Sequence, residues 1–174
     1  RRAALYRTTL ILSLSMNRIN ELEQIRPVET ADAPVIAAIY NWYIVHSRCT
    51  FEEQQVSDAG MGRRIAAAGA SMPWLVLEEG GIVLGYAYAS VWKARAAYDR
   101  SREVTVYLHH NATGKGRGRR LYQQLVDELG NTPIHSLIAS IALPNAGSVA
   151  LHESLGFEKV GQFSEIGFKF GEFV

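Results

Sequence analysis

A basic, glycine-rich segment holds the most suggestive residue pattern in this sequence. It reads HHNATGKGRGRR over residues 109–120, with glycines at positions 114, 116 and 118. Alternate glycines at a helix entry let backbone N–H groups converge on an anion, and the positive end of the helix dipole adds to the attraction. The segment therefore predicts a phosphate cradle, with an RNA-contacting basic patch as the alternative. The cations that would assist a phosphorylated ligand are Lys115, Arg117, Arg119 and Arg120.

Two better-known phosphate motifs do not fit this segment. No P-loop spacing is present, and Arg119 stands where a dinucleotide-binding fingerprint needs its third glycine. The segment instead lies between an alternating strand and an amphipathic helix, which favours the cradle over the RNA patch.

The residues before this segment alternate as a strand does, from Glu103 to Leu108. The even-numbered side chains, all aliphatic, would share one face of the strand, and the odd-numbered ones would share the other. Glu103 is a carboxylate beside the predicted cradle, and a partly buried carboxylate there could act as a general base. The alternative is a glutamate that only contacts solvent.

Hydrophobic periodicity predicts the elements that position these residues, and they make one α+β domain with a mixed sheet. Residues 25–28 form a strand, and Asn145 caps a short helix that closes at Gly156. The first helix has Pro34 in its first turn and its apolar stripe at 36, 39, 40 and 43. The other elements are a helix over 57–68, a hairpin of 74–78 and 82–91, a helix with leucines at 121, 125 and 129 and Val126 on one face, a buried strand over 137–143 and a final strand from 159 onward.

Composition excludes several classes of protein. The chain has 174 residues, of which 48 % are hydrophobic and 20 % charged, with a net charge of +1, so neither wholesale disorder nor general polyanion binding is expected. The one cysteine, Cys49, excludes a disulfide framework and a four-cysteine zinc site and suits the cytoplasm. No apolar run approaches the roughly 20 residues of a membrane span. His109 and His110 would point apart, so no metal site is expected.

The first residues are interpreted separately from the domain. Basic residues are followed by a short apolar patch over 10–14, but no cleavage site of the signal-peptide type follows. We interpret residues 1–24 as a leader or non-native extension, with a start near Met16, and residues 25–174 as the domain.

Two motifs resemble those of the GNAT N-acetyltransferases. The segment TGKGRG at 113–118 resembles the pyrophosphate motif [QR]-x-x-G-x-[GA], although Thr113 replaces the usual Gln or Arg. The segment NAGSVALHESLGF at 145–157 resembles the second signature of the family. VWKARAAYD at 91–99, EVTVY at 103–107, ALPN at 142–145, IYN at 39–41 and GFKFG at 167–171 resemble the phosphinothricin N-acetyltransferase branch. That branch normally continues through a further strand, so the last strand is expected to be truncated.

The resemblance implies a GNAT fold, in which a mixed central sheet is flanked by helices and acetyl-CoA binds at a splayed pair of strands. The implied activity is acetylation of a small amine such as phosphinothricin, methionine sulfoximine or methionine sulfone, by a cytoplasmic homodimer without metal, nucleic acid or membrane. The alternatives are another amine, such as a polyamine, an aminoglycoside or a protein N-terminus, or a module that only binds acyl-CoA or nucleic acid.

The same resemblance assigns roles to individual residues. Glu103 would be the general base, and His152 would protonate the thiolate, unless it is a core histidine. The acceptor would bind at Lys93, Ala94, Arg95 and Tyr98. The cofactor would bind at Val106, Tyr107, Leu108, Gly114, Lys115, Gly116, Arg117, Gly118, Arg119, Asn145 and Ser148.

Overall fold

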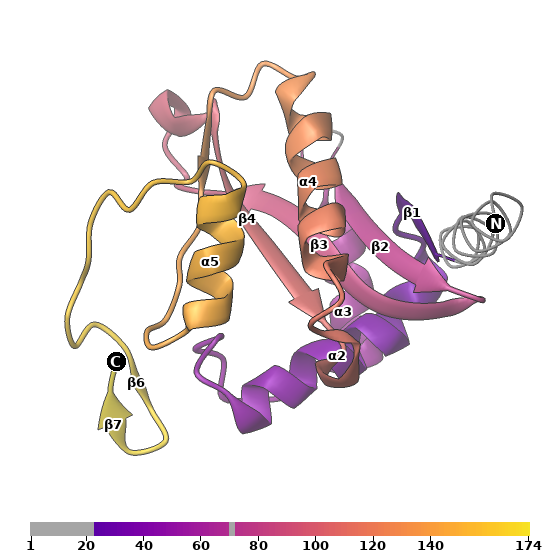
Figure 1. Cartoon of the computed structure of the whole chain (residues 1–174), viewed down its shortest axis with the longest axis horizontal. Coiled ribbons are helices and arrows are strands. Elements are labelled where there is room, and N and C mark those ends of the chain that lie inside the picture. Colours follow the sequence, from indigo (N-terminus) through magenta and orange to yellow (C-terminus); the bar gives the residue numbers. More distant parts are fainter. Residues whose placement is uncertain (1–22, 70–71) are drawn as a thin grey trace, which may run out of the picture.

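The computed structural model describes residues 23–69 and 72–174. A five-stranded sheet has the order β1-β2-β3-β4-β5, in which every neighbouring pair is antiparallel except the parallel pair β4 and β5 (Figure 1). This is the mixed sheet that the sequence predicts. Its strands are β1 (Glu23–Pro27), β2 (Trp74–Glu79), β3 (Ile82–Val91), β4 (Ser101–Leu108) and β5 (Ser136–Ile138).

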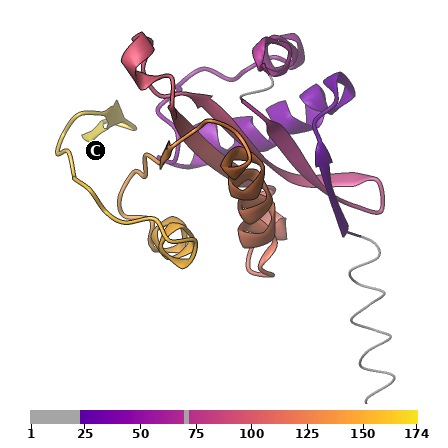
Figure 2. The ribbon, with the colours of Figure 1, turned by 90° about the horizontal axis from the view of Figure 1, so that it is seen from above.

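Helices cover both faces of the sheet, as the view from above shows (Figure 2). On one face, α2 (Ala33–His46) and α3 (Asp58–Ala67) pack over Val76, Tyr86 and Tyr107. On the other, α4 (Arg117–Gly130) and α5 (Ala146–Ser154) pack over a cluster that includes Leu75 and Val104. Strand β4 therefore alternates between two buried faces. The short 3-10 turns are η1 (Thr30–Asp32), η2 (Ala96–Tyr98) and η3 (His110–Ala112).

Local signals in the sequence set the helix ends. The hydroxyl of Ser57 accepts the Gly60 N–H at the start of α3, and the Asn145 side chain accepts the Ser148 N–H at the start of α5. After α5 the chain turns at Gly156, whose φ of 83° is in the left-handed region. The predicted caps at Asn145 and Gly156 are confirmed.

Two strand predictions are wrong in extent. Strand β5 covers only Ser136–Ile138, and all three residues are half-buried rather than buried, because β4 and β5 diverge and leave residues 139–143 without a ladder. Residues 159–167 form no strand; instead β6 (Phe168–Lys169) and β7 (Glu172–Phe173) make a separate hairpin outside the main sheet (Figure 1).

Strand β1 begins at Glu23, two residues before the start predicted for the domain. The rest of the predicted extension, residues 1–22, lies outside the described residues. No helix in the described part of the chain has the length and apolarity to cross a membrane.

Candidate active site

Strands β4 and β5 separate soon after they meet. Their ladder holds only Ser101 with Ser136, Arg102 with Leu137 and Glu103 with Ile138. Strand β4 continues to Leu108 beside β3, so over residues 104–108 its other edge has no strand neighbour among the described residues. This open edge can take an extended ligand by strand-like pairing.

The direction of the backbone groups on β4 follows from its last bond to β3. The His109 N–H donates to the Leu84 carbonyl at 2.7 Å. Because successive residues in an antiparallel strand point these groups to opposite sides, the backbone of Tyr107 faces β3 and that of Val106 and Leu108 faces the open edge. The backbone groups of Tyr107 are therefore directed to β3. Of the three residues predicted to pair with the cofactor, only Val106 and Leu108 direct their backbone N–H and C=O to the open edge.

Two tyrosine hydroxyls flank Val106 on this edge. The Tyr122 hydroxyl donates to the Val104 carbonyl at 3.1 Å, and the Tyr43 hydroxyl donates to the Leu108 carbonyl at 2.8 Å. Both carbonyls thus have partners from helices, while the Val106 N–H and C=O stand between them.

Two helix N-termini lie at the same open end. Helices α4 and α5 each follow the carboxyl end of one of two parallel strands, so both begin where β4 and β5 have separated (Figure 1). Gly114 and Gly116 have φ of 83° and 71°, and Gly116 caps α4. These left-handed positions need glycine, and the first turn of α4 presents backbone N–H groups without intrahelical acceptors. The geometry fits the predicted anion cradle.

The four cations of this segment do not act alike. The buried guanidinium of Arg117 pairs with Glu23 at 2.6 Å and Glu79 at 2.8 Å, and Arg120 also pairs with Glu23. Burial alone would raise the pKa of Glu23, but hydrogen bonds from the two arginines outweigh it and lower that pKa. The pairs of Arg117 and Arg120 with Glu23 therefore join α4 to the sheet, and of the four cations only Arg117 is buried. Lys115 and Arg119 are exposed.

A nucleic-acid-binding module would need an exposed aromatic ring near the basic segment to stack on bases. Tyr122, beside the basic segment in the sequence, is fully buried, so its ring cannot stack on a base.

Glu103 occupies the last pair of the β4–β5 ladder, where the strands begin to separate. Its Oε1 accepts a hydrogen bond from the Ser140 hydroxyl at 2.7 Å. The sequence interpretation missed Ser140, because it placed residue 140 inside a buried strand. Glu103 also lies near Tyr88, where its charge adds to burial in raising the pKa of the tyrosine hydroxyl. The carboxylate thus lies on the α2 side of the sheet, at the point where β4 and β5 separate.

His152 has internal partners on both ring nitrogens. Nδ1 lies 2.7 Å from the Ser148 carbonyl, and Nε2 lies 3.1 Å from the Tyr122 hydroxyl. Burial lowers the pKa of His152 despite the bond to Ser148, so the imidazole is neutral at pH 7. Because a carbonyl can only accept, Nδ1 carries the proton, and Nε2 faces the Tyr122 hydroxyl. That hydroxyl has a single proton, which it can give either to the Val104 carbonyl or to Nε2. This geometry favours the core histidine over the proton donor.

The predicted acceptor loop starts close to Glu103 but is exposed. Ser90 pairs with Glu103 across β3 and β4, and the loop leaves β3 one residue later. The Lys93 ammonium lies 4.8 Å from the centre of the Trp92 ring. The predicted residues Lys93, Ala94, Arg95 and Tyr98 are all exposed.

The other histidines near the site stack on aromatic rings. His110 stacks on Trp42 with ring centres 4.6 Å apart and on His109 at 4.3 Å. Within residues 23–69 and 72–174 no group of three or more His, Cys, Asp or Glu side chains could hold a metal ion.

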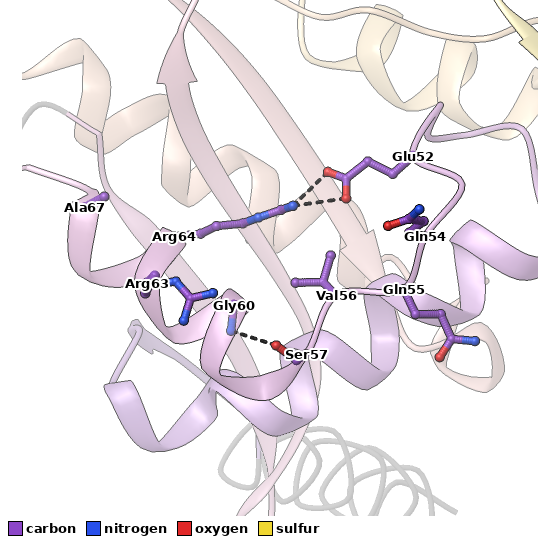
Figure 3. Close-up of a pocket in the computed structure, with 9 residues that line it drawn as sticks. All are labelled: Glu52, Gln54, Gln55, Val56, Ser57, Gly60, Arg63, Arg64 and Ala67. Atoms are coloured by element: carbon purple, nitrogen blue, oxygen red, sulfur yellow. Dashed lines mark hydrogen bonds and ion pairs between the residues drawn. The ribbon is translucent and has the colours of Figure 1, made fainter.

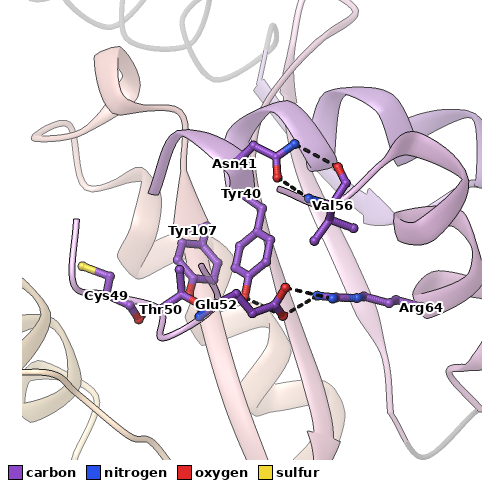
Figure 4. Close-up of polar contacts among 8 residues, drawn as sticks. All are labelled: Tyr40, Asn41, Cys49, Thr50, Glu52, Val56, Arg64 and Tyr107. Carbon is purple, nitrogen blue, oxygen red and sulfur yellow. Dashed lines mark hydrogen bonds and ion pairs between the residues drawn. The ribbon is translucent and has the colours of Figure 1, made fainter. Parts of the chain in front are cut away.

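A polar network on the α2 side was not predicted. Arg64 of α3 makes two bonds to the Glu52 carboxylate, at 2.8 and 3.0 Å (Figure 3). The Tyr40 hydroxyl lies 2.7 Å from the Thr50 hydroxyl and 3.1 Å from Glu52 (Figure 4). Mainly by burial, the pKa of Tyr40 is raised to about 12. Periodicity placed Tyr40 in the core but could not show its polar partners.

A hollow of about 550 Å³ adjoins this network. Figure 3 shows the side chains around it, which come from the segment after α2 and from α3. Its lining residues are Glu52, Gln54, Gln55, Val56, Ser57, Gly60, Arg63, Arg64 and Ala67.

The fold and the open strand edge define an acyltransferase class, and comparison with known proteins identifies it. Residues 25–174 match the family model described as an acetyltransferase (GNAT) domain. The chain belongs to the GNAT family and is an N-acetyltransferase.

Relatives and solved structures resemble it over most of their length. The chain is 38 % identical to a phosphinothricin N-acetyltransferase of Streptomyces viridochromogenes, over 85 % of this chain and 81 % of that protein. It is 35 % identical to an L-methionine sulfoximine/L-methionine sulfone acetyltransferase of Salmonella typhimurium, over 86 % and 88 %. A GNAT phosphinothricin acetyltransferase of Sinorhizobium meliloti, solved in complex with acetyl-CoA, superposes with a TM-score of 0.84 at 35 % identity, over 88 % and 84 %.

Proposed function

We propose that this enzyme transfers the acetyl group of acetyl-CoA to the amino group of a small amino acid analogue, of the phosphinothricin, methionine sulfoximine or methionine sulfone type. The observation that carries the proposal is the Glu103 carboxylate at the point where β4 and β5 separate, beside the open edge. The names of the similar proteins support this class of acceptor.

The cosubstrate would lie along the open edge of β4, between β4 and β5. Acetyl-CoA supplies the acetyl group as a thioester. The Val106 and Leu108 backbone would pair with its extended arm, and the N-terminus of α4 from Gly114 to Arg119 would receive the pyrophosphate, aided by the exposed Lys115. Asn145 and Ser148, in the first turn of α5, would contact the same arm at the opposite wall of the splay.

The acceptor would approach from the α2 side, where Glu103 can take a proton from its ammonium group. A backbone N–H on the open edge of β4 would polarise the thioester carbonyl. Lys93 and Arg95, with Ala94 and Tyr98 in the same loop, would attract the carboxylate or phosphinate of the acceptor. These cations oppose a polyamine or aminoglycoside, which is itself positively charged.

A thiol-release assay tests this function. The full chain is incubated with acetyl-CoA and, in turn, phosphinothricin, methionine sulfoximine, methionine sulfone and spermidine. We expect thiol release with the first three and none above background with spermidine. Release with spermidine alone would assign the enzyme to polyamines, and no release from a folded sample that binds acetyl-CoA would indicate an acyl-CoA sensor.

We further propose that the enzyme is a cytoplasmic homodimer. The aromatic residues Tyr40 and Tyr43 of α2 pack internally, but large apolar side chains are exposed near the C-terminus. A second copy would cover them. Sedimentation at micromolar concentration should give a dimer, and a monomer would refute this. These exposed residues are Val160, Phe163, Ile166, Phe168, Phe170 and Phe173.

A further inference from the structure

A buried lysine in the C-terminal hairpin has no role in the chemistry described so far. Lys169 of β6 is 2 % exposed, and its Nζ donates to the Thr50 carbonyl at 2.7 Å. Among the described residues no carboxylate lies within ion-pair distance of this ammonium. A methionine would fill similar space without burying a charge, so the amine contributes a directed hydrogen bond rather than volume.

The hairpin that carries Lys169 rests on the segment after α2. Arg48 pairs with Glu172 of β7. Gly167 lies so close to the Phe51 ring that a Cβ on the glycine would come within 2.5 Å of it. Lys169 therefore reaches Thr50 from a hairpin that is already seated beside residues 48–51.

Residues 49–52 connect the two sides of the proposed site. The Cys49 sulfur accepts a hydrogen bond from Asn145 Nδ2 at 3.4 Å, at the start of α5. The Tyr107 hydroxyl points to the Cys49 carbonyl at 3.5 Å, from the sheet face that also carries Glu103. Tyr40 then joins Thr50 to Glu52 through its hydroxyl (Figure 4).

We propose that Lys169 is a positioning residue for the acceptor side of the active site. By fixing the Thr50 carbonyl, its ammonium holds residues 49–52 as a wall of the acceptor site. The inference rests on the proposed function, because it assumes that the acceptor enters on the α2 side. The cofactor contacts lie on β4, α4 and α5, so the effect should fall on the acceptor.

The test compares Lys169→Met with the matched control Glu172→Gln. The first variant keeps the length of the side chain and removes its donor, and the second breaks the exposed pair of the same hairpin with Arg48. For Lys169→Met we expect acceptor KM to rise by roughly tenfold, the size of a lost hydrogen bond from a charged donor. The KM for acetyl-CoA should stay near the wild-type value, and Glu172→Gln should match the wild type in both KM values. Because Lys169→Met leaves the buried Thr50 carbonyl without its donor, its Tm should also fall, and the comparison of the two KM values decides the test.

Three results would overturn the proposal: an unchanged acceptor KM, an equal rise in both KM values, or the same rise in Glu172→Gln. The last would mean that docking of the hairpin matters rather than the bond to Thr50. If Lys169→Met does not fold, Lys169→Gln, which is too short to reach Thr50, carries the same expectation. If the wild type acetylates a different amine, the proposed function fails, and the same comparison of KM values is then made with that amine.

Discussion

The position of Glu103 depends on two short-range features of the chain. Its place in the last β4–β5 pair puts the carboxylate at the mouth of the splay, and the hydroxyl of Ser140 fixes one of its oxygens. Within the described part of the chain no hydrogen bond reaches the second oxygen, which under the proposed function would receive the acceptor's ammonium. A base in this position would act on the amine before the amine attacks the thioester.

Glu103→Gln should leave acetyl-CoA affinity unchanged, because the cofactor contacts lie elsewhere. We expect kcat to fall by about 100- to 10,000-fold at pH 7, the usual range for a positioned base. The deficit should shrink as pH rises towards 9, because the acceptor then loses its proton in solution. The measurement is kcat and acceptor KM from pH 6 to 9 for both proteins.

Ser140→Ala is the matched control for that variant. It keeps the carboxylate and removes the one hydrogen bond that orients it, so its loss in kcat should be smaller and should not depend on pH in the same way. If Glu103→Gln changes only acceptor KM, the glutamate binds the ammonium by charge. An unchanged kcat at every pH would contradict its role as base.

His152 makes a separate prediction about stability. Burial lowers its pKa in the folded protein below the ordinary 6.5, so the unfolded chain binds the proton more readily. Its contribution is therefore present above pH 6.5 and is lost as pH falls towards the folded pKa. Each unit of lowering corresponds to roughly 1.4 kcal/mol. Urea unfolding at pH 7.5, 6.5 and 5.5 should show this decline.

The decline should be weaker in His152→Gln, whose side chain does not titrate. His135→Gln is the control, because His135 is exposed and should keep the wild-type decline. Glu23 and Asp32, whose pKa values are lowered by arginine partners, lose their contributions only below their ordinary values of 4.5 and 3.8. The same decline in both histidine variants would exclude His152 as its source.

Among the elements, helix α4 could be predicted almost completely from the sequence. Its apolar positions repeat with helical spacing, and Leu121, Leu125 and Leu129 are fully or almost fully buried as expected. The hairpin of β2 and β3 was equally clear, because Gly80 and Gly81 stand at its turn with positive φ. These elements depend on local patterns.

Strand β5 and the C-terminal hairpin could not be predicted in the same way. Residues 137–143 have an apolar, strand-like composition, but a ladder needs a neighbour, and β4 diverges after Glu103. The network of Tyr40, Thr50 and Lys169 joins positions far apart in the chain, and no local spacing indicates such contacts. The motifs predict the cofactor contacts and the acceptor loop at Lys93, whereas the network around Tyr40 is visible only in the fold.

Two cations at the start of α4 look alike in the sequence but differ in burial, because Lys115 is exposed and Arg117 is buried. Lys115→Gln should weaken acetyl-CoA binding without changing Tm, because the side chain is exposed at the cradle. Arg117→Gln should instead destabilise the fold by about 3 kcal/mol, since it removes a buried pair with Glu23. Calorimetric titration and urea unfolding of both variants check this. The opposite assignment of effects would make Arg117 a ligand for the phosphate.

At the scale of the whole molecule, the sheet and its helices together form one opening, at the place where β4 and β5 separate. Helices on both faces fix β4, while β5 pairs with it for three residues and then leaves. The opening lies between the helix N-termini on one side and the network around Glu52 on the other. Under the proposed function, an extended, phosphorylated donor and a small amine would reach Glu103 from different directions.

The central claim is that this opening binds acetyl-CoA, and calorimetric titration of acetyl-CoA into the folded full chain tests it most directly. We expect saturable binding with one acetyl-CoA per chain, and an affinity that weakens when the left-handed Gly116 is replaced by valine. A chain with a cooperative unfolding transition that shows no saturable binding would contradict the account.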